Sequence, residues 1–185
     1  LGVALGLVSV DAHADELEVH ASGVADGRLT LRVGGAPTGR IASALSDRMR
    51  SRLELILRAF ERTDGLTGLL GDRLLAERRV TKTAYYDPFS GNYVIETMRS
   101  AADGTTGESS ARIEVGPEVE TAVDELLSLA DVEVPQEALE PAGRRYLLAQ
   151  VRLRPLMLAE RLRILSLVIP KYTVASAWTP IEVPR

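Results

Sequence analysis

The stretch that decides the fold is residues 73–98, RLLAERRVTKTAYYDPFSGNYVIETM. Its centre, DPFSGN at residues 87–92, is the strongest turn signal in the chain, because proline suits the second position of a turn while glycine and asparagine tolerate positive φ angles. The flanking segments, Arg73 to Tyr86 and Tyr93 to Met98, therefore pair as antiparallel strands. Leu53 to Arg62, with leucines at every second position, is predicted as a third strand of the same meander.

Alternation of apolar and polar residues predicts further strands outside the meander. Asp26-Gly27 lies between two alternating segments, Glu16 to His20 and Arg28 to Val33, and this arrangement is typical of a hairpin. Arg145 to Arg154 alternates in the same way, and Pro155 is expected to close that strand.

Two segments show the spacing of amphipathic helices. The first begins at Thr38 and is expected to run for about three turns. The second, with Pro117 at its first position, is expected to carry its apolar stripe as far as Ala130. The segment from Leu156 to Ile169 stays open between a helix and an extended cover over a sheet edge. The first helix has Ile41, Leu45, Met49 and Arg52 at helical spacing, and the second has Val119, Val123, Leu126, Leu127 and Ala130.

Strands outnumber helices, and no strand–helix–strand alternation is present. The predicted fold class is therefore α+β, a mostly antiparallel β-sheet or sandwich with two or three packed amphipathic helices. A length of 185 residues with 45% hydrophobic residues suits one domain with a substantial core. We place this single domain at residues 15–185.

Residues 1–14 have the pattern of a secretory signal peptide. Leu1 to Val10 is an uncharged apolar run, and Ala12-His13-Ala14 follows as an A-x-A cleavage triplet. The run is too short to cross a bilayer, and no later segment reaches that length without charges. We therefore expect an exported, periplasmic protein with no transmembrane anchor in the mature chain.

Composition excludes several kinds of chemistry. The chain has no cysteine, and its two histidines are His13, which leaves with the signal peptide, and His20, which is expected to be a bystander. A thiolate site, or a metal site built on several imidazoles, is therefore excluded. A net charge of −4 argues against a partner that is a nucleic acid. We expect no cofactor, no metal and no catalytic residue.

Charge changes sign along the last third of the chain. Residues 101–140 hold eleven Asp and Glu against Arg112, whereas residues 141–163 hold six arginines against Glu160. One interpretation is that the acidic helix packs beside the basic strand and partly neutralises it. A second is an arginine-lined binding face made of Arg144, Arg145, Arg152 and Arg154. A third is a pair of catalytic carboxylates of the glycosidase kind.

The order of features resembles a known family. YYDPFSGNY at residues 85–93 is followed by an acidic amphipathic helix, by YLLAQVRL at residues 146–153, and by SAW at residues 176–178. This order is similar to that of the exported bacterial proteins of the domain of unknown function 4390 family. The resemblance implies a small periplasmic or envelope-associated protein without an established activity, and it supplies no site residues.

These observations favour a non-enzymatic module that binds an envelope protein or another envelope component. A soluble carrier of an apolar ligand such as a lipid is the alternative, since the Leu- and Val-rich segment from Leu156 to Ile169 could line a cavity. A carboxylate-based hydrolase is the third hypothesis.

Overall fold

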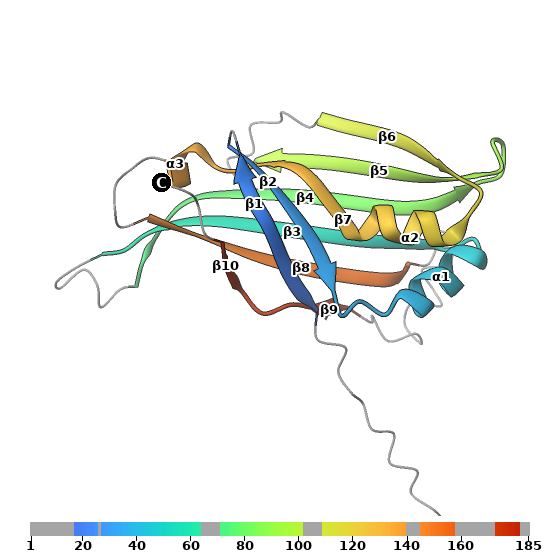
Figure 1. The fold of residues 1–185 in the computed structure, drawn as a ribbon, viewed down its shortest axis with the longest axis horizontal. Helices are drawn as coiled ribbons and strands as arrows, with labels where there is room; N and C mark the ends of the chain where they lie inside the picture. Colours follow the sequence, from blue (N-terminus) through green and yellow to red (C-terminus); the bar gives the residue numbers. More distant parts are fainter. Residues whose placement is uncertain are drawn as a thin grey trace, which may run out of the picture.

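A computed structural model describes residues 17–25, 27–63, 71–101, 109–139, 145–157 and 173–181. They form a large sheet of seven strands, a small sheet of three strands and three short helices (Figure 1). This architecture confirms the predicted α+β class with a mostly antiparallel sheet. The predicted signal peptide, residues 1–14, lies outside the described residues.

The large sheet is antiparallel throughout, in the order β10-β8-β3-β4-β5-β6, with β9 also paired to β8. Its centre is the predicted meander, and the DPFSGN turn between β4 and β5 has the left-handed glycine it requires, Gly91 at φ 72°. The strands are β3 (Arg50–Glu61), β4 (Arg73–Asp87), β5 (Asn92–Ala101), β6 (Ser109–Gly116), β8 (Arg145–Met157), β9 (Val174–Ala175) and β10 (Thr179–Ile181).

The small sheet contains the predicted N-terminal hairpin, β1 (Glu18–Ala25) and β2 (Arg28–Gly34), and has the order β1-β2-β7. Its third strand, β7 (Ser128–Glu133), pairs antiparallel with β2 and was not predicted. The helices are α1 (Thr38–Ser46), α2 (Val119–Leu127) and the four-residue α3 (Gln136–Leu139).

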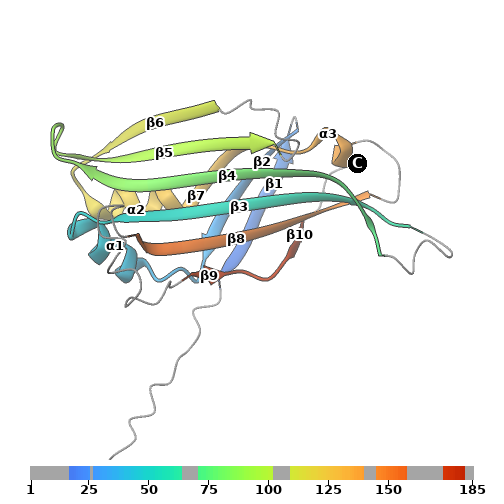
Figure 2. The ribbon, with the colours of Figure 1, turned by 180° about the vertical axis from the view of Figure 1, so that it is seen from behind.

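The molecule has two layers. Both views place α1, α2 and the small sheet on the same side of the large sheet, with β1 and β2 crossing its strands steeply (Figures 1 and 2). In Figure 2 no described helix or strand lies over the opposite side, which we call the open face. Because side chains alternate along a strand, the open face carries the even-numbered residues 52–58 of β3 and 146–154 of β8.

The core lies between the two layers. The covered face of the large sheet and the second layer both contribute leucines that are almost completely buried, each stabilising the fold by about 1.5–3 kcal/mol. Apolar contact is therefore the main interaction that holds the two layers together. The largest contributors include Leu53, Leu55, Leu57 and Leu147 from the large sheet, Leu29 and Leu31 from β2, Ile41 and Leu45 from α1, and Leu126 from α2.

The expected apolar stripes of both helices extend too far. α1 begins at Thr38 as expected but stops at Ser46, so Met49 and Arg52 lie outside it, because Arg48 adopts a left-handed conformation (φ 58°) that turns the chain into β3. α2 begins after Pro117 and ends at Leu127, so Ala130 belongs to β7 and not to the helix.

Lys82 explains where α2 ends. It lies on β4 with its side chain 9% exposed, and its ammonium donates to the carbonyl oxygens of Glu125 and Ser128 at 2.7 and 2.6 Å. The same nitrogen contacts Glu125 Oε1 at 2.7 Å. A buried cation thus satisfies carbonyl groups that the end of a helix leaves without an intrahelical partner.

Pro155 does not close β8 as expected, since the strand continues to Met157. The register between β3 and β8 shifts around Ser51, and the Ser51 hydroxyl donates to the Pro155 carbonyl. At such an irregularity proline's missing N–H disrupts no regular ladder bond. Of the segment from Leu156 to Ile169, the first two residues complete β8 and residues 158–169 lie outside the described residues.

Candidate functional site

Alternation along the strands decides which arginines reach the open face. Leu53 and Leu55 of β3 point into the core, so Arg52 between them points to the open face. On β8 the same alternation turns Arg152 and Arg154 outward, and both are exposed. Arg50, at the start of β3, lies beside them, with its guanidinium 4.9 Å from the centre of the Tyr85 ring. We call Arg50, Arg52, Arg152 and Arg154 the arginine cluster.

The strand register sets two arginines of the cluster against each other. Arg52 lies directly opposite Arg154 in the β3–β8 pair. Like charges in this position destabilise a sheet by roughly 0.2–1 kcal/mol. The Nε atom of Arg52 is also buried without a hydrogen-bond partner. Both features are unfavourable for stability in the free protein, and an anion bound between the two guanidinium groups would relieve the repulsion between the charges.

Within the described part of the chain, no carboxylate forms an ion pair with the arginine cluster. Arg152 donates only to the amide oxygen of Gln150, at 3.2 Å. The nearby Glu96 accepts a hydrogen bond of 2.6 Å from the Tyr85 hydroxyl. Burial and this bond to a carboxylate raise the pKa of Tyr85, so the phenol stays neutral at physiological pH. Glu54 lies opposite Arg152 in the β3–β8 pair and forms its ion pair with Arg79, so the excess of positive charge at this end of the open face comes from Arg50, Arg52 and Arg154.

The middle of the open face is neutralised, in contrast. Glu77, 8% exposed, receives hydrogen bonds of 2.7 Å from Arg58 and from Arg79. Burial acts to raise the pKa of Glu77, but the hydrogen bonds and charges of the two arginines outweigh it and lower that pKa below its ordinary value. Arg79 also lies 3.9 Å from Glu54.

Aromatic rings occupy the other end of the open face. Phe60 and Tyr146 stack with ring centres 5.4 Å apart, and Arg62 lies over the Tyr146 ring. The Tyr146 hydroxyl donates to Asp72 at 2.6 Å, and this bond, with burial, raises the pKa of Tyr146. Arg58 lies 4.8 Å from the Trp178 ring centre. These rings are already engaged by neighbouring side chains.

The structure divides the arginine face expected from sequence. Arg152 and Arg154 lie together on the open face, but Arg145 donates to the Glu137 carbonyl of α3 at 2.9 Å, on the covered side of the sheet. Arg144 lies outside the described residues. Sequence reasoning missed Arg50 and Arg52, although the alternation along β3 already placed Arg52 on the face opposite to the leucines.

The expectation that the acidic helix packs beside the basic strand was wrong. α2 packs against α1 and against β4, β5 and β6, rather than against β8. Its acidic residues are therefore not the counter-charges of Arg152 and Arg154. Lone His20, on β1, has its side chain 63% exposed and lies 3.1 Å from Glu18.

Exposed apolar side chains accompany the arginine cluster. Phe89, in the turn that extends beyond this end of the sheet, is 98% exposed. Leu156, two residues after Arg154 on β8, is 36% exposed. Exposed apolar side chains at the same end of the sheet as arginines without an ion-pair partner among the described residues are typical of a surface that contacts both charged and apolar groups.

The described residues lack a membrane-spanning helix and a metal-binding cluster. None of the helices there has the length and apolar character needed to span a bilayer. Nor do three or more His, Asp or Glu side chains gather there in an arrangement that could hold a metal ion. In comparisons with known proteins, no family model, no curated protein and no solved structure matches this chain, so its likeness to an exported bacterial family stays a prediction.

Proposed function

We propose that this chain is an exported, non-enzymatic binding module that docks on phosphate-bearing lipid at a membrane surface of the cell envelope. The observation that carries the proposal is the arginine cluster, four guanidinium groups at one end of the open face without an ion-pair partner among the described residues. Guanidinium groups suit phosphate because they bind it through paired hydrogen bonds.

Two further features support a membrane surface as the partner. Phe89 and Leu156 expose apolar area at the same end of the sheet, and such side chains enter the boundary between headgroups and acyl chains. The whole chain has a net charge of −4, so an anionic membrane would repel it on average. Attraction must therefore come from a local patch, and the arginine cluster is such a patch.

Export is the part of the proposal that rests on sequence. Leu1 to Ala14 has the apolar run and the A-x-A triplet of a cleaved leader. Expression of the full-length precursor, followed by mass spectrometry of the periplasmic fraction, should find a chain that begins at Asp15. A protein that stays in the cytoplasm with residues 1–14 attached would contradict export and leave the vesicle experiment to decide the binding role.

Sedimentation with lipid vesicles tests the binding role directly. We expect the protein to sediment with vesicles of phosphatidylcholine and phosphatidylglycerol, not with phosphatidylcholine alone, and to be released by salt. Each arginine near an anionic surface contributes about 1 kcal/mol, so removing two should weaken binding by about 2 kcal/mol, roughly 30-fold. The test variant is Arg152→Gln/Arg154→Gln, which changes two exposed side chains.

The matched control is Arg32→Gln/Arg73→Gln, with the same change in net charge. Arg32 lies exposed on β2, and Arg73 lies exposed at the opposite end of the large sheet from the cluster. The control should bind as the unaltered protein does. Equal losses in both variants, or no sedimentation with anionic vesicles, would refute the proposal. Binding of soluble polyglutamate in place of vesicles would point instead to an acidic protein partner.

A further inference from the structure

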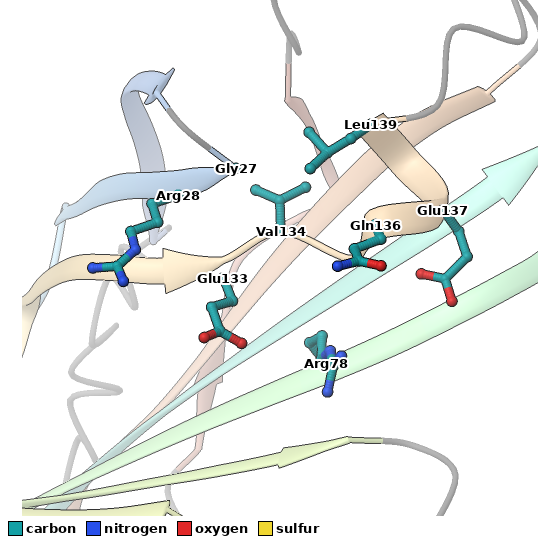
Figure 3. A pocket seen from close by; sticks show the side chains of 8 residues that line it. All are labelled: Gly27, Arg28, Arg78, Glu133, Val134, Gln136, Glu137 and Leu139. Carbon is teal, nitrogen blue, oxygen red and sulfur yellow. The ribbon is translucent and has the colours of Figure 1, made fainter.

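A separate cavity lies on the covered side of the large sheet, away from the arginine cluster. It has a volume of about 440 Å³ and opens between the end of the small sheet, α3 and β4 (Figure 3). This size falls in the lower part of the range of about 300–1,000 Å³ typical of small-molecule sites. The lining residues are Gly27, Arg28, Arg78, Glu133, Val134, Gln136, Glu137 and Leu139.

Charges of opposite sign face each other across this cavity. Figure 3 shows the half-buried Arg78 of β4 on one wall, with the exposed Glu133 and Glu137 on the segment opposite. Among the described residues, none pairs with the side chains of Arg78, Glu133 or Glu137 in an ion pair. Arg28, the second cation, lies 3.7 Å from Asp131 outside the lining.

The remaining wall is apolar. Val134 is 5% exposed, and Leu139 of α3 is 38% exposed. Gly27, held at φ 72°, lies close to this wall, and a Cβ at this position would lie 3.2 Å from Leu139 Cδ1. Glycine therefore lets the turn of the β1–β2 hairpin and the side chain of Leu139 approach closely, and a backbone hydrogen bond of 2.9 Å from Val134 to Gly27 holds the two segments together.

We infer that this cavity binds a small zwitterion with an apolar side chain, of the class of a free aliphatic amino acid. The ligand carboxylate pairs with Arg78, its ammonium lies between Glu133 and Glu137, and its side chain rests on Val134 and Leu139. A ligand with both charges pairs with Arg78 on one wall and with the exposed glutamates on the other, whereas a ligand with one charge pairs with one wall alone. This inference does not depend on the proposed membrane role.

Titration followed by NMR tests the site with three matched probes. Leucine carries both charges, isopentylamine lacks the carboxylate, and 4-methylpentanoic acid lacks the ammonium. We expect leucine to shift the backbone amide signals of Gly27 and Val134 in a saturable way, and each singly charged analogue to bind at least about tenfold more weakly. An amine that binds as well as leucine would overturn the inference, and so would an acid that does.

Variants decide whether Arg78 and the two glutamates hold the ligand. Arg78→Met and Glu133→Gln/Glu137→Gln should each weaken leucine binding by at least about tenfold, while Arg32→Met and Glu120→Gln, exposed and remote, should not change it. A circular dichroism spectrum checks that each variant is folded. The unaltered protein also decides the matter alone, because leucine without effect on Gly27 and Val134 at millimolar concentration would refute the site.

Discussion

Replacing Lys82 with methionine removes one charge and leaves a stem of similar length. In the folded protein the Lys82 ammonium makes three contacts of 2.6–2.7 Å, to the carbonyl oxygens of Glu125 and Ser128 and to the Glu125 carboxylate. Methionine makes none of them. It keeps most of the packing volume, so no large cavity term enters the comparison.

The magnitude follows from what each contact loses. A hydrogen bond to a charged group contributes about 1.5–3 kcal/mol, and a buried acceptor left unpaired adds a desolvation penalty. The Glu125 side chain is 36% exposed and regains water when its partner is removed, so the ion pair itself counts for little. The two carbonyl groups dominate, and we expect the free energy of unfolding to fall by about 2–4 kcal/mol.

Urea unfolding monitored by far-ultraviolet circular dichroism measures this change. The midpoint should fall with an unchanged m-value, which assigns the loss to stability and not to a different unfolded state. Glu125→Gln, which leaves both carbonyl contacts, should lose less than about 1 kcal/mol. Arg32→Met, which removes an exposed charge on β2, should change the free energy of unfolding by no more than about 0.5 kcal/mol. A loss below about 1 kcal/mol for Lys82→Met would refute the assignment of Lys82 as the anchor of α2.

Two more predictions concern the large sheet. Because the pKa of Glu77 is lowered in the folded state, its stabilisation is present above the ordinary glutamate value of 4.5 and is lost as pH falls through the lowered pKa. Glu77→Gln should therefore destabilise by about 1–2 kcal/mol at neutral pH, and urea midpoints should converge with those of the unaltered protein in acid; a pH-independent gap would contradict this. Gly91→Ala should destabilise the protein by about 1–2 kcal/mol, because alanine is strained at a φ of 72°; the nearest atom to the added Cβ is 3.9 Å away, so no steric clash contributes. Gly39→Ala, in helix α1 with open space around the added Cβ, should instead stabilise the protein by about 0.5–1 kcal/mol. Thermal unfolding of the two glycine variants should move the melting temperature in opposite directions.

The elements that sequence predicted best are those whose signal is local. The DPFSGN turn and its strands are specified by residues adjacent in the chain, and so is the Asp-Gly hairpin of the small sheet. β7 was missed because its residue Ala130 continues the apolar stripe of α2. Lys82, which stabilises the end of α2 at Leu127, lies 43 residues away from Glu125 in the sequence. No window of helical periodicity contains such a contact.

The arginine cluster has the same limitation. Alternation along β8 alone sets Arg152 and Arg154 on one side, and the sequence predicted that pair. Their neighbour Arg52 comes from β3, about a hundred residues earlier, and only the register of the β3–β8 pair sets Arg52 opposite Arg154. Hydrophobic patterning shows which face a residue occupies but not which strand lies beside it.

The charges and apolar residues of the open face support the proposal of an external partner for the arginine cluster. Ile56 and Val94 lie on this face and are 1% and 0% exposed, although no described helix or strand covers them. The stem of a long neighbouring side chain such as Arg79, which lies opposite Ile56, can shield an apolar residue while its charged head stays in water. Such shielding explains why long arginine side chains lie on the open face. It does not explain why the guanidinium groups of the arginine cluster have no carboxylate partner among the described residues. In the middle of the face Glu77 supplies the counter-charge to Arg58 and Arg79, so the sheet can accommodate acidic residues among its arginines. At the arginine cluster, no acidic residue among the described residues lies within ion-pair distance of the guanidinium groups. A bound anion would supply the missing counter-charge there.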